Sequence, residues 1–214
     1  PLSGLLFPYF EALPDAMFVD RLPAEKREKL MAYYLNCLKR HLYATGPDKI
    51  LLEKVALIAG RLHSVIQTLP DIRLVHLVRH PYQSIPSLIS MFVVPWKTMA
   101  PKATKRTETF QALAEIIFHY YRHILEIKKT FPAEQFLEIY YDDLVANPQP
   151  AVERIYNHFQ IPLNDTYRRF LAEASGQAES YKSKHHYNLE EFGLNKQQVY
   201  TELKDVFEEY VFKP

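Results

Sequence analysis

Two short apolar runs, far apart in the sequence, constrain the fold most. RLVHLV (73–78) and QFLEIYY (135–141) have the length and the Val, Leu, Ile and aromatic content of strands, and a long helical pattern lies between them. We expect the first run to be buried on both faces, as in a parallel sheet. A third strand is expected in KILLEKVAL, ending near Glu53 or Lys54. Strands that alternate with helices pair in parallel, so the sequence predicts an α/β fold with a parallel sheet flanked by helices.

Most of the remaining sequence has helical spacing of its apolar residues. The pattern predicts helices over 23–43, 61–69, 84–94, 108–130, 151–161, 165–175 and 195–210. Loops are expected over 95–106 and 180–187. No repeat, low-complexity tract or linker interrupts the pattern, so residues 1–214 are expected to form a single domain.

The charge balance and the single cysteine exclude several classes of protein. The chain has 26 Lys and Arg against 25 Asp and Glu, a balance that does not favour bulk nucleic-acid binding. Cys37 is the only cysteine in the sequence, which rules out an internal disulfide and fits a reducing compartment. No apolar run approaches the roughly 18 residues of a membrane span, and no signal-peptide pattern opens the sequence. We therefore expect a cytoplasmic protein without a membrane span; its oligomeric state stays open.

The stretch LVHLVRHPYQSIPSLIS (74–90) places an arginine directly after a predicted strand. In an open parallel sheet, ligands bind beyond the carboxyl ends of the strands, and the fork of donors on Arg79 suits a phosphate there. A helix that starts near Ser84 would bring its N-terminus and the Ser87 hydroxyl toward the same point. The alternative is structural: Arg79 closes the strand end with a salt bridge, and a serine caps the helix. Spacing alone does not decide between the two.

The order of these residues resembles a known family. An apolar strand, an Arg, a Pro two residues later and a Ser at the eighth position are similar to the 3′-phosphate-binding motif of sulfotransferases that use 3′-phosphoadenosine 5′-phosphosulfate (PAPS). LEIYYDDLVANPQP, SYKSKHHYNLEEFGL and LLEKVALIAGRLHS resemble further family segments in the right order, with most likeness to the bacterial and tyrosylprotein branches. The resemblance covers about residues 50 to 200. It implies a P-loop-NTPase-like sheet, PAPS as co-substrate without a metal, and in-line transfer of the sulfuryl group to a hydroxyl or amine acceptor.

The resemblance implies a binding site for the nucleotide. Arg79 and Ser87 would bind the 3′-phosphate, and Lys182, Ser183 and Lys184 would add donors to the same phosphate from a loop on the other side. The alternative is that this loop is only a solvated basic segment without a binding role.

Two further roles follow from the same resemblance. Tyr141 would approach the adenine or ribose, unless it is only a half-buried strand aromatic. Lys54 lies 25 residues before the motif arginine and would stabilise charge on the bridging oxygen as it leaves. Its structural alternative is a surface lysine paired with Glu53.

The sequence also departs from the family pattern. The expected first strand and its phosphate-binding loop are absent from residues 1–50, because neither Gly4 nor Gly46 is followed by a suitable Lys-Ser/Thr pair. Val55 and Ala56 stand where tyrosylprotein relatives carry Asp-Pro, and no general base is assigned. We expect the chain to be part of a longer sulfotransferase, incomplete at its N-terminus. The rival hypothesis is a non-catalytic nucleotide-binding or protein-interaction module that retains only the 3′-phosphate site.

One histidine pair has a spacing that can hold a metal. His119 and His123 share a helix face at i, i+4, but no third ligand is evident in the sequence, which favours a solvated or half-buried pair. The class of the sulfuryl acceptor is not predicted.

Overall fold

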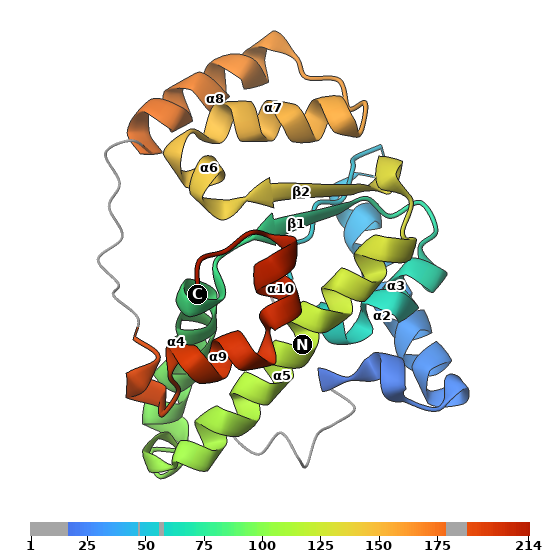
Figure 1. Cartoon of the computed structure of the whole chain (residues 1–214). Helices are drawn as coiled ribbons and strands as arrows, with labels where there is room; N and C mark the ends of the chain where they lie inside the picture. The colour runs from blue at the N-terminus through green and yellow to red at the C-terminus, as the bar shows by residue number, and fades with distance from the viewer. Residues whose placement is uncertain (1–16, 47, 56–57, 179–187) are drawn as a thin grey trace.

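Figure 1 shows the computed structural model of the chain, which describes residues 17–46, 48–55, 58–178 and 188–214. Its described strands are β1 (Leu74–Val78) and β2 (Phe136–Tyr140), which pair in parallel from Leu74 opposite Phe136 to Val78 opposite Tyr140. The strands predicted at 73–78 and 135–141 and the α/β class are therefore confirmed. The third predicted strand is wrong for the described residues, because 51–55 have no regular secondary structure.

Helices account for most of the described chain. The α-helices are α2 (Ala24–Thr45), α3 (Leu62–Thr68), α4 (Pro81–Met99), α5 (Thr107–Thr130), α6 (Tyr141–Ala146), α7 (Pro148–His158), α8 (Asp165–Ala178), α9 (Lys196–Glu202) and α10 (Lys204–Glu209). Short 3₁₀ turns are η3 (Val19–Arg21), η4 (Ala59–Arg61), η5 (Ala103–Lys105), η6 (Ala133–Gln135) and η7 (Glu190–Phe192). The predicted C-terminal helix divides into α9 and α10 at Leu203, which is fully buried.

Helix α4 is longer at both ends than the sequence predicts. It begins at Pro81 rather than near Ser84, because the His80 ring accepts the Tyr82 N–H and proline suits the first helical position. It continues to Met99 through Pro95, so the first residues of the predicted loop 95–106 are helical. Its buried face, which includes Ile85, Ile89, Phe92 and Trp96, recurs at helical spacing and outweighs the two internal prolines.

The two faces of the small sheet have different neighbours. In Figure 1, α7 and α8 lie beyond β2, whereas α4, α5, α9 and α10 lie on the β1 side. Leu137 and Ile139 pack against α7 in a small core with Ala151 and Phe159. Their register partners Val75 and Leu77 are 36% and 44% exposed. The prediction that the first strand is buried on both faces is therefore wrong: α7 packs on β2 and leaves these two side chains of β1 partly open.

A charged cluster fastens the opposite face of the sheet to α5 and α10. Glu138 bonds its register partner His76 at 3.3 Å, Lys128 at 2.7 Å and the Tyr210 hydroxyl at 2.5 Å. Burial alone would raise the pKa of Glu138, but the hydrogen bonds from these three groups outweigh it and lower the pKa to about 2. This carboxylate therefore stays ionised and holds the sheet against the two helices. Within the described residues, no helix is long and apolar enough to cross a membrane.

Candidate functional site

Arg79 and Tyr141 meet beyond the carboxyl ends of the two strands. Arg79 follows β1 directly, and Tyr141 opens α6 directly after β2. The guanidinium carbon of Arg79 lies 4.3 Å from the centre of the Tyr141 ring, a cation–π contact. Among the described residues, no carboxylate lies within ion-pair distance of this guanidinium, so the structural salt bridge considered for Arg79 is not formed there. Apart from Nε, which donates to Gln83, its N–H groups have no acceptor among the described residues.

Ser87 lies on the same stripe of α4 as the partner of Arg79. Arg79 Nε donates to Gln83 Oε1 at 3.4 Å, and Ser87 follows Gln83 by four residues, on the same helix face. The predicted helix start near Ser84 is wrong by one turn, because α4 begins at Pro81 and Ser87 lies in its second turn. The first amide groups of α4 are already bonded within the His80 turn. An anion at this edge would therefore depend on side chains more than on free helix amides.

Tyr121 of α5 also contributes to this edge, a role that the sequence did not predict. Its hydroxyl donates to the Arg79 carbonyl at 3.3 Å and also bonds the Ser84 hydroxyl. Burial raises the pKa of Tyr121 to about 12, so the hydroxyl remains protonated and keeps donating. A Tyr in a long helical pattern looks like an ordinary core aromatic, which is why no sequence signal marked it.

No described contact places Lys54 at this edge. Lys54 is exposed, and no described contact joins it to Arg79, Ser87 or Tyr141. The alternative pairing with Glu53 is not formed either, because the Glu53 carboxylate accepts the Tyr34 hydroxyl instead. The catalytic role of Lys54 therefore stays a prediction.

The structure does not test the three residues of the loop 180–187 that are predicted to bind the 3′-phosphate. Lys182, Ser183 and Lys184 lie outside the described residues.

A separate cavity of about 230 Å³ lies on α5. It is lined by Phe18, Asp20, Arg21, Gly60, His63, His119 and His123. The His119 and His123 rings stack with centres 5.8 Å apart, and each faces a charged residue of η3. Within the described ranges, no group of three or more His, Cys, Asp or Glu side chains is arranged to hold a metal.

Comparison with known proteins identifies the family. A sequence model described as the sulfotransferase family matches residues 8–165, which include Arg79, Ser87 and Tyr141. The chain belongs to the sulfotransferase family. This sulfotransferase-family chain is 25% identical over 121 residues to omega-hydroxy-beta-dihydromenaquinone-9 sulfotransferase Stf3 of Mycobacterium bovis and of Mycobacterium tuberculosis. The aligned part covers 53% of this chain and 30% of each relative, so the chain matches less than a third of their length.

A solved structure shares the fold. The crystal structure of sulfotransferase STF9 from Mycobacterium avium has a TM-score of 0.77 and 19% sequence identity to this chain. The likeness covers 97% of this chain and 52% of STF9. The arrangement of β1, β2 and the surrounding helices is therefore that of a sulfotransferase fold, and this chain spans about half the length of STF9.

Proposed function

We propose that this chain binds PAPS and takes part in sulfuryl transfer to a hydroxyl or amine acceptor. The observation that carries the proposal is the Arg79 guanidinium. It lies at the carboxyl edge of a parallel sheet, on the face of Tyr141, and none of the described carboxylates pairs with it. In a chain of the sulfotransferase family, that position matches the motif arginine for the 3′-phosphate. A guanidinium binds such a phosphate with charge-assisted, directional hydrogen bonds.

Four described side chains are assigned to different parts of the nucleotide. Arg79 and Ser87 bind the 3′-phosphate, and Tyr141 holds the guanidinium while contacting the adenine or ribose. Lys54 stabilises negative charge on the leaving oxygen. The loop lysines Lys182 and Lys184, with Ser183, add donors to the 3′-phosphate.

Sulfuryl transfer at this site is an in-line displacement. The acceptor oxygen or nitrogen forms a bond to sulfur while the bond from sulfur to the bridging phosphate oxygen breaks. Adenosine 3′,5′-bisphosphate leaves with the electron pair. The acceptor proton passes to a general base, a role to which no described residue is assigned. The sulfuryl group is already activated in PAPS, so the protein contributes mainly positioning and charge stabilisation.

The acceptor to test first is a hydroxyl on a prenylated compound. The names of the Stf3 relatives specify a hydroxylated dihydromenaquinone. We therefore place a lipid-like hydroxyl ahead of carbohydrate, tyrosine and small hydroxyl compounds as the acceptor of this chain.

The proposal is tested by titration calorimetry with two nucleotides that differ in one group. Adenosine 3′,5′-bisphosphate should bind about ten to a hundred times more tightly than adenosine 5′-phosphate, because charge-assisted hydrogen bonds contribute roughly 1.5–3 kcal/mol. Equal affinities would contradict the assignment of the edge to the 3′-phosphate. An assay of bisphosphate release from PAPS with a prenyl-hydroxyl acceptor then separates an enzyme from a nucleotide-binding module.

A further inference from the structure

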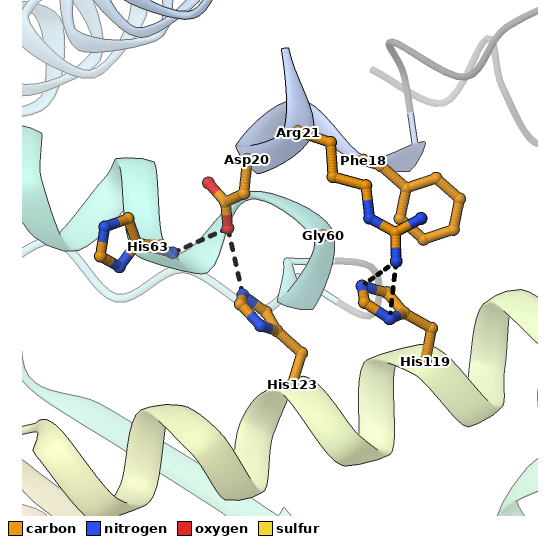
Figure 2. Close-up of a pocket in the computed structure, with 7 residues that line it drawn as sticks. All are labelled: Phe18, Asp20, Arg21, Gly60, His63, His119 and His123. Carbon is orange, nitrogen blue, oxygen red and sulfur yellow. Dashed lines mark hydrogen bonds and ion pairs between the residues drawn. The ribbon is translucent and has the colours of Figure 1, made fainter. Parts of the chain in front are cut away.

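The cavity on α5 is built from three segments that are distant in the sequence. Figure 2 shows Phe18, Asp20 and Arg21 on one side, Gly60 and His63 on a second, and His119 and His123 rising from α5. Gly60 allows the close approach of the first two segments, because a Cβ atom there would lie 1.7 Å from the Met17 carbonyl oxygen. The fold thus holds these side chains around one space.

The acidic half of the cavity is already satisfied by the protein. One oxygen of Asp20 accepts the Ser64 N–H at 2.8 Å and the Ser64 hydroxyl. The other accepts the His63 N–H at 3.0 Å and pairs with His123 Nε2 at 3.2 Å. The second nitrogen of His123 lies 3.5 Å from Glu126. The hydrogen bond that His123 makes to Asp20 is the main reason that the pKa of His123 is raised, so the protonated imidazole is favoured beside this carboxylate, whose oxygens already have partners.

The cationic half has N–H donors that no described residue accepts. Arg21 Nη2 lies 3.0 Å from His119 Nδ1 and 3.3 Å from Nε2, and the guanidinium carbon lies 4.5 Å from the centre of the Phe18 ring. A guanidinium has several N–H donors and a neutral imidazole accepts only one of them. Within the described chain, the other N–H groups of Arg21 have no acceptor. Burial, then the charges of Arg21 and His123, lower the pKa of His119, which keeps one ring N–H as a further donor.

The cavity is separate from the proposed nucleotide site. Residues two apart on a helix point about 200° apart around its axis, so Tyr121 faces away from both His119 and His123. Tyr121 is the residue of α5 that bonds the Arg79 carbonyl. The two cationic regions therefore lie on opposite sides of α5.

We propose that this cavity binds a small oxyanion group, a sulfate, phosphate or carboxylate, between Arg21 and His119 with Phe18 as its apolar wall. Guanidinium and imidazole donors converge on the space, and the neighbouring carboxylate is already paired. A volume of about 230 Å³ is below the range of roughly 300–1,000 Å³ typical of drug-sized ligands, so it suits an ion or the end of a larger molecule.

The binding should depend on pH through His119. The titratable or charged groups around this ring come from η3, from α3 and from its own helix: Asp20, Arg21, His63, Arg122, His123 and Glu126. A bound anion offsets the positive charge of Arg21 and favours the protonated imidazole. By reciprocity of linked equilibria, the affinity should then rise as the pH falls through the titration range of His119.

The test is a sulfate titration followed by NMR at the His119 ring protons, with chloride at equal ionic strength as the control salt. Sulfate stays doubly charged across neutral pH, so any pH dependence belongs to the protein. We expect saturable shifts with sulfate and none with chloride. Arg21→Met should weaken binding at least about tenfold. Arg40→Met, at an exposed arginine of α2, should leave it unchanged.

Two further arms make the result specific to this cavity. Arg79→Ala should retain the His119 response to sulfate. The response then does not come from anion binding at the nucleotide edge, and it would persist even if the proposed nucleotide binding failed. Phenyl sulfate binding more tightly than sulfate would assign the cavity to an esterified group beside Phe18, and equal affinity would assign it to the free ion. No saturable shift with either compound, or equal loss in Arg21→Met and Arg40→Met with both variants folded, would overturn the proposal.

Discussion

The two cationic regions on either side of α5 differ in how their arginines are held. Arg79 is placed by a strand end and stacks on Tyr141, with a single long hydrogen bond to Gln83. Arg21 stands in a 3₁₀ turn beside an ion-paired aspartate and a histidine stack. The first region depends on elements adjacent in the sheet, whereas the second depends on tertiary contacts between distant segments. Changes to the packing should therefore disturb the cavity before they disturb the nucleotide edge.

The largest expected effect is that of Gly60→Ala. The new Cβ would overlap the Met17 carbonyl oxygen, and neither backbone can move without shifting η3 and Asp20. We expect a loss of about 3 kcal/mol in the free energy of unfolding, measured by urea denaturation. Gly176→Ala is the matched control, because nothing lies within 4 Å of its added Cβ, and it should leave stability unchanged or raise it. Equal destabilisation by the two variants would contradict the packing described around Gly60.

Asp20→Asn should have the next largest effect. The variant keeps the shape of the side chain but removes the charge that faces His123, at positions where the two side chains are 12% and 16% exposed. We expect a loss of about 2 kcal/mol at slightly acidic pH, in the range of hydrogen bonds to charged groups.

The pH dependence of the same pair gives an independent readout. The pKa of His123 is raised in the folded protein, chiefly by Asp20, so its contribution to stability is complete below the unfolded value of 6.5 and is lost as the pH rises through the folded pKa. Asp20→Asn should therefore flatten the fall in unfolding free energy above about pH 6.5, measured by urea denaturation across this range. An unchanged profile would mean that the pair does not couple.

Tyr121→Phe should have the smallest effect on stability and act on the other side of α5. It removes the hydrogen bonds to the Arg79 carbonyl and to Ser84, which we expect to cost about 1 kcal/mol. Binding of adenosine 3′,5′-bisphosphate should weaken severalfold in calorimetry, because Arg79 is less well positioned. The sulfate response at His119 should be retained. A variant that loses the sulfate response and keeps the nucleotide would reverse the comparison between the two regions.

Local sequence order predicted that Arg79 stands at the carboxyl edge of the sheet, but it did not predict the cavity. The spacing from the apolar strand to Arg79 and Ser87 is local, and parallel pairing then brought Tyr141 to the same edge. The start of α4 was wrong by one turn, because His80 caps the helix through its ring, a cap that helix propensity does not reveal.

Long-range contacts account for what the sequence did not predict. Asp20 and His123 are far apart in the chain, and Tyr121 looks like a core residue until its hydroxyl partner is known. The exposure of Val75 and Leu77 could not be predicted from their composition, because it depends on which strand α7 covers. The division into a single domain and the roles of Lys54 and the loop lysines stay predictions.

The central claim is that Arg79 binds the 3′-phosphate of the nucleotide. Its most direct test is a double-mutant-type cycle in which either the arginine side chain or the 3′-phosphate is removed. Calorimetry measures adenosine 3′,5′-bisphosphate and adenosine 5′-phosphate on the unchanged chain and on Arg79→Ala. Arg73→Ala, an exposed arginine just before the opposite end of β1, serves as the control. We expect Arg79→Ala to weaken the bisphosphate by about ten- to a hundredfold and to leave the monophosphate nearly unaffected, so the preference for the 3′-phosphate disappears. If Arg79→Ala weakens both nucleotides equally, or no more than Arg73→Ala does, Arg79 does not bind the 3′-phosphate.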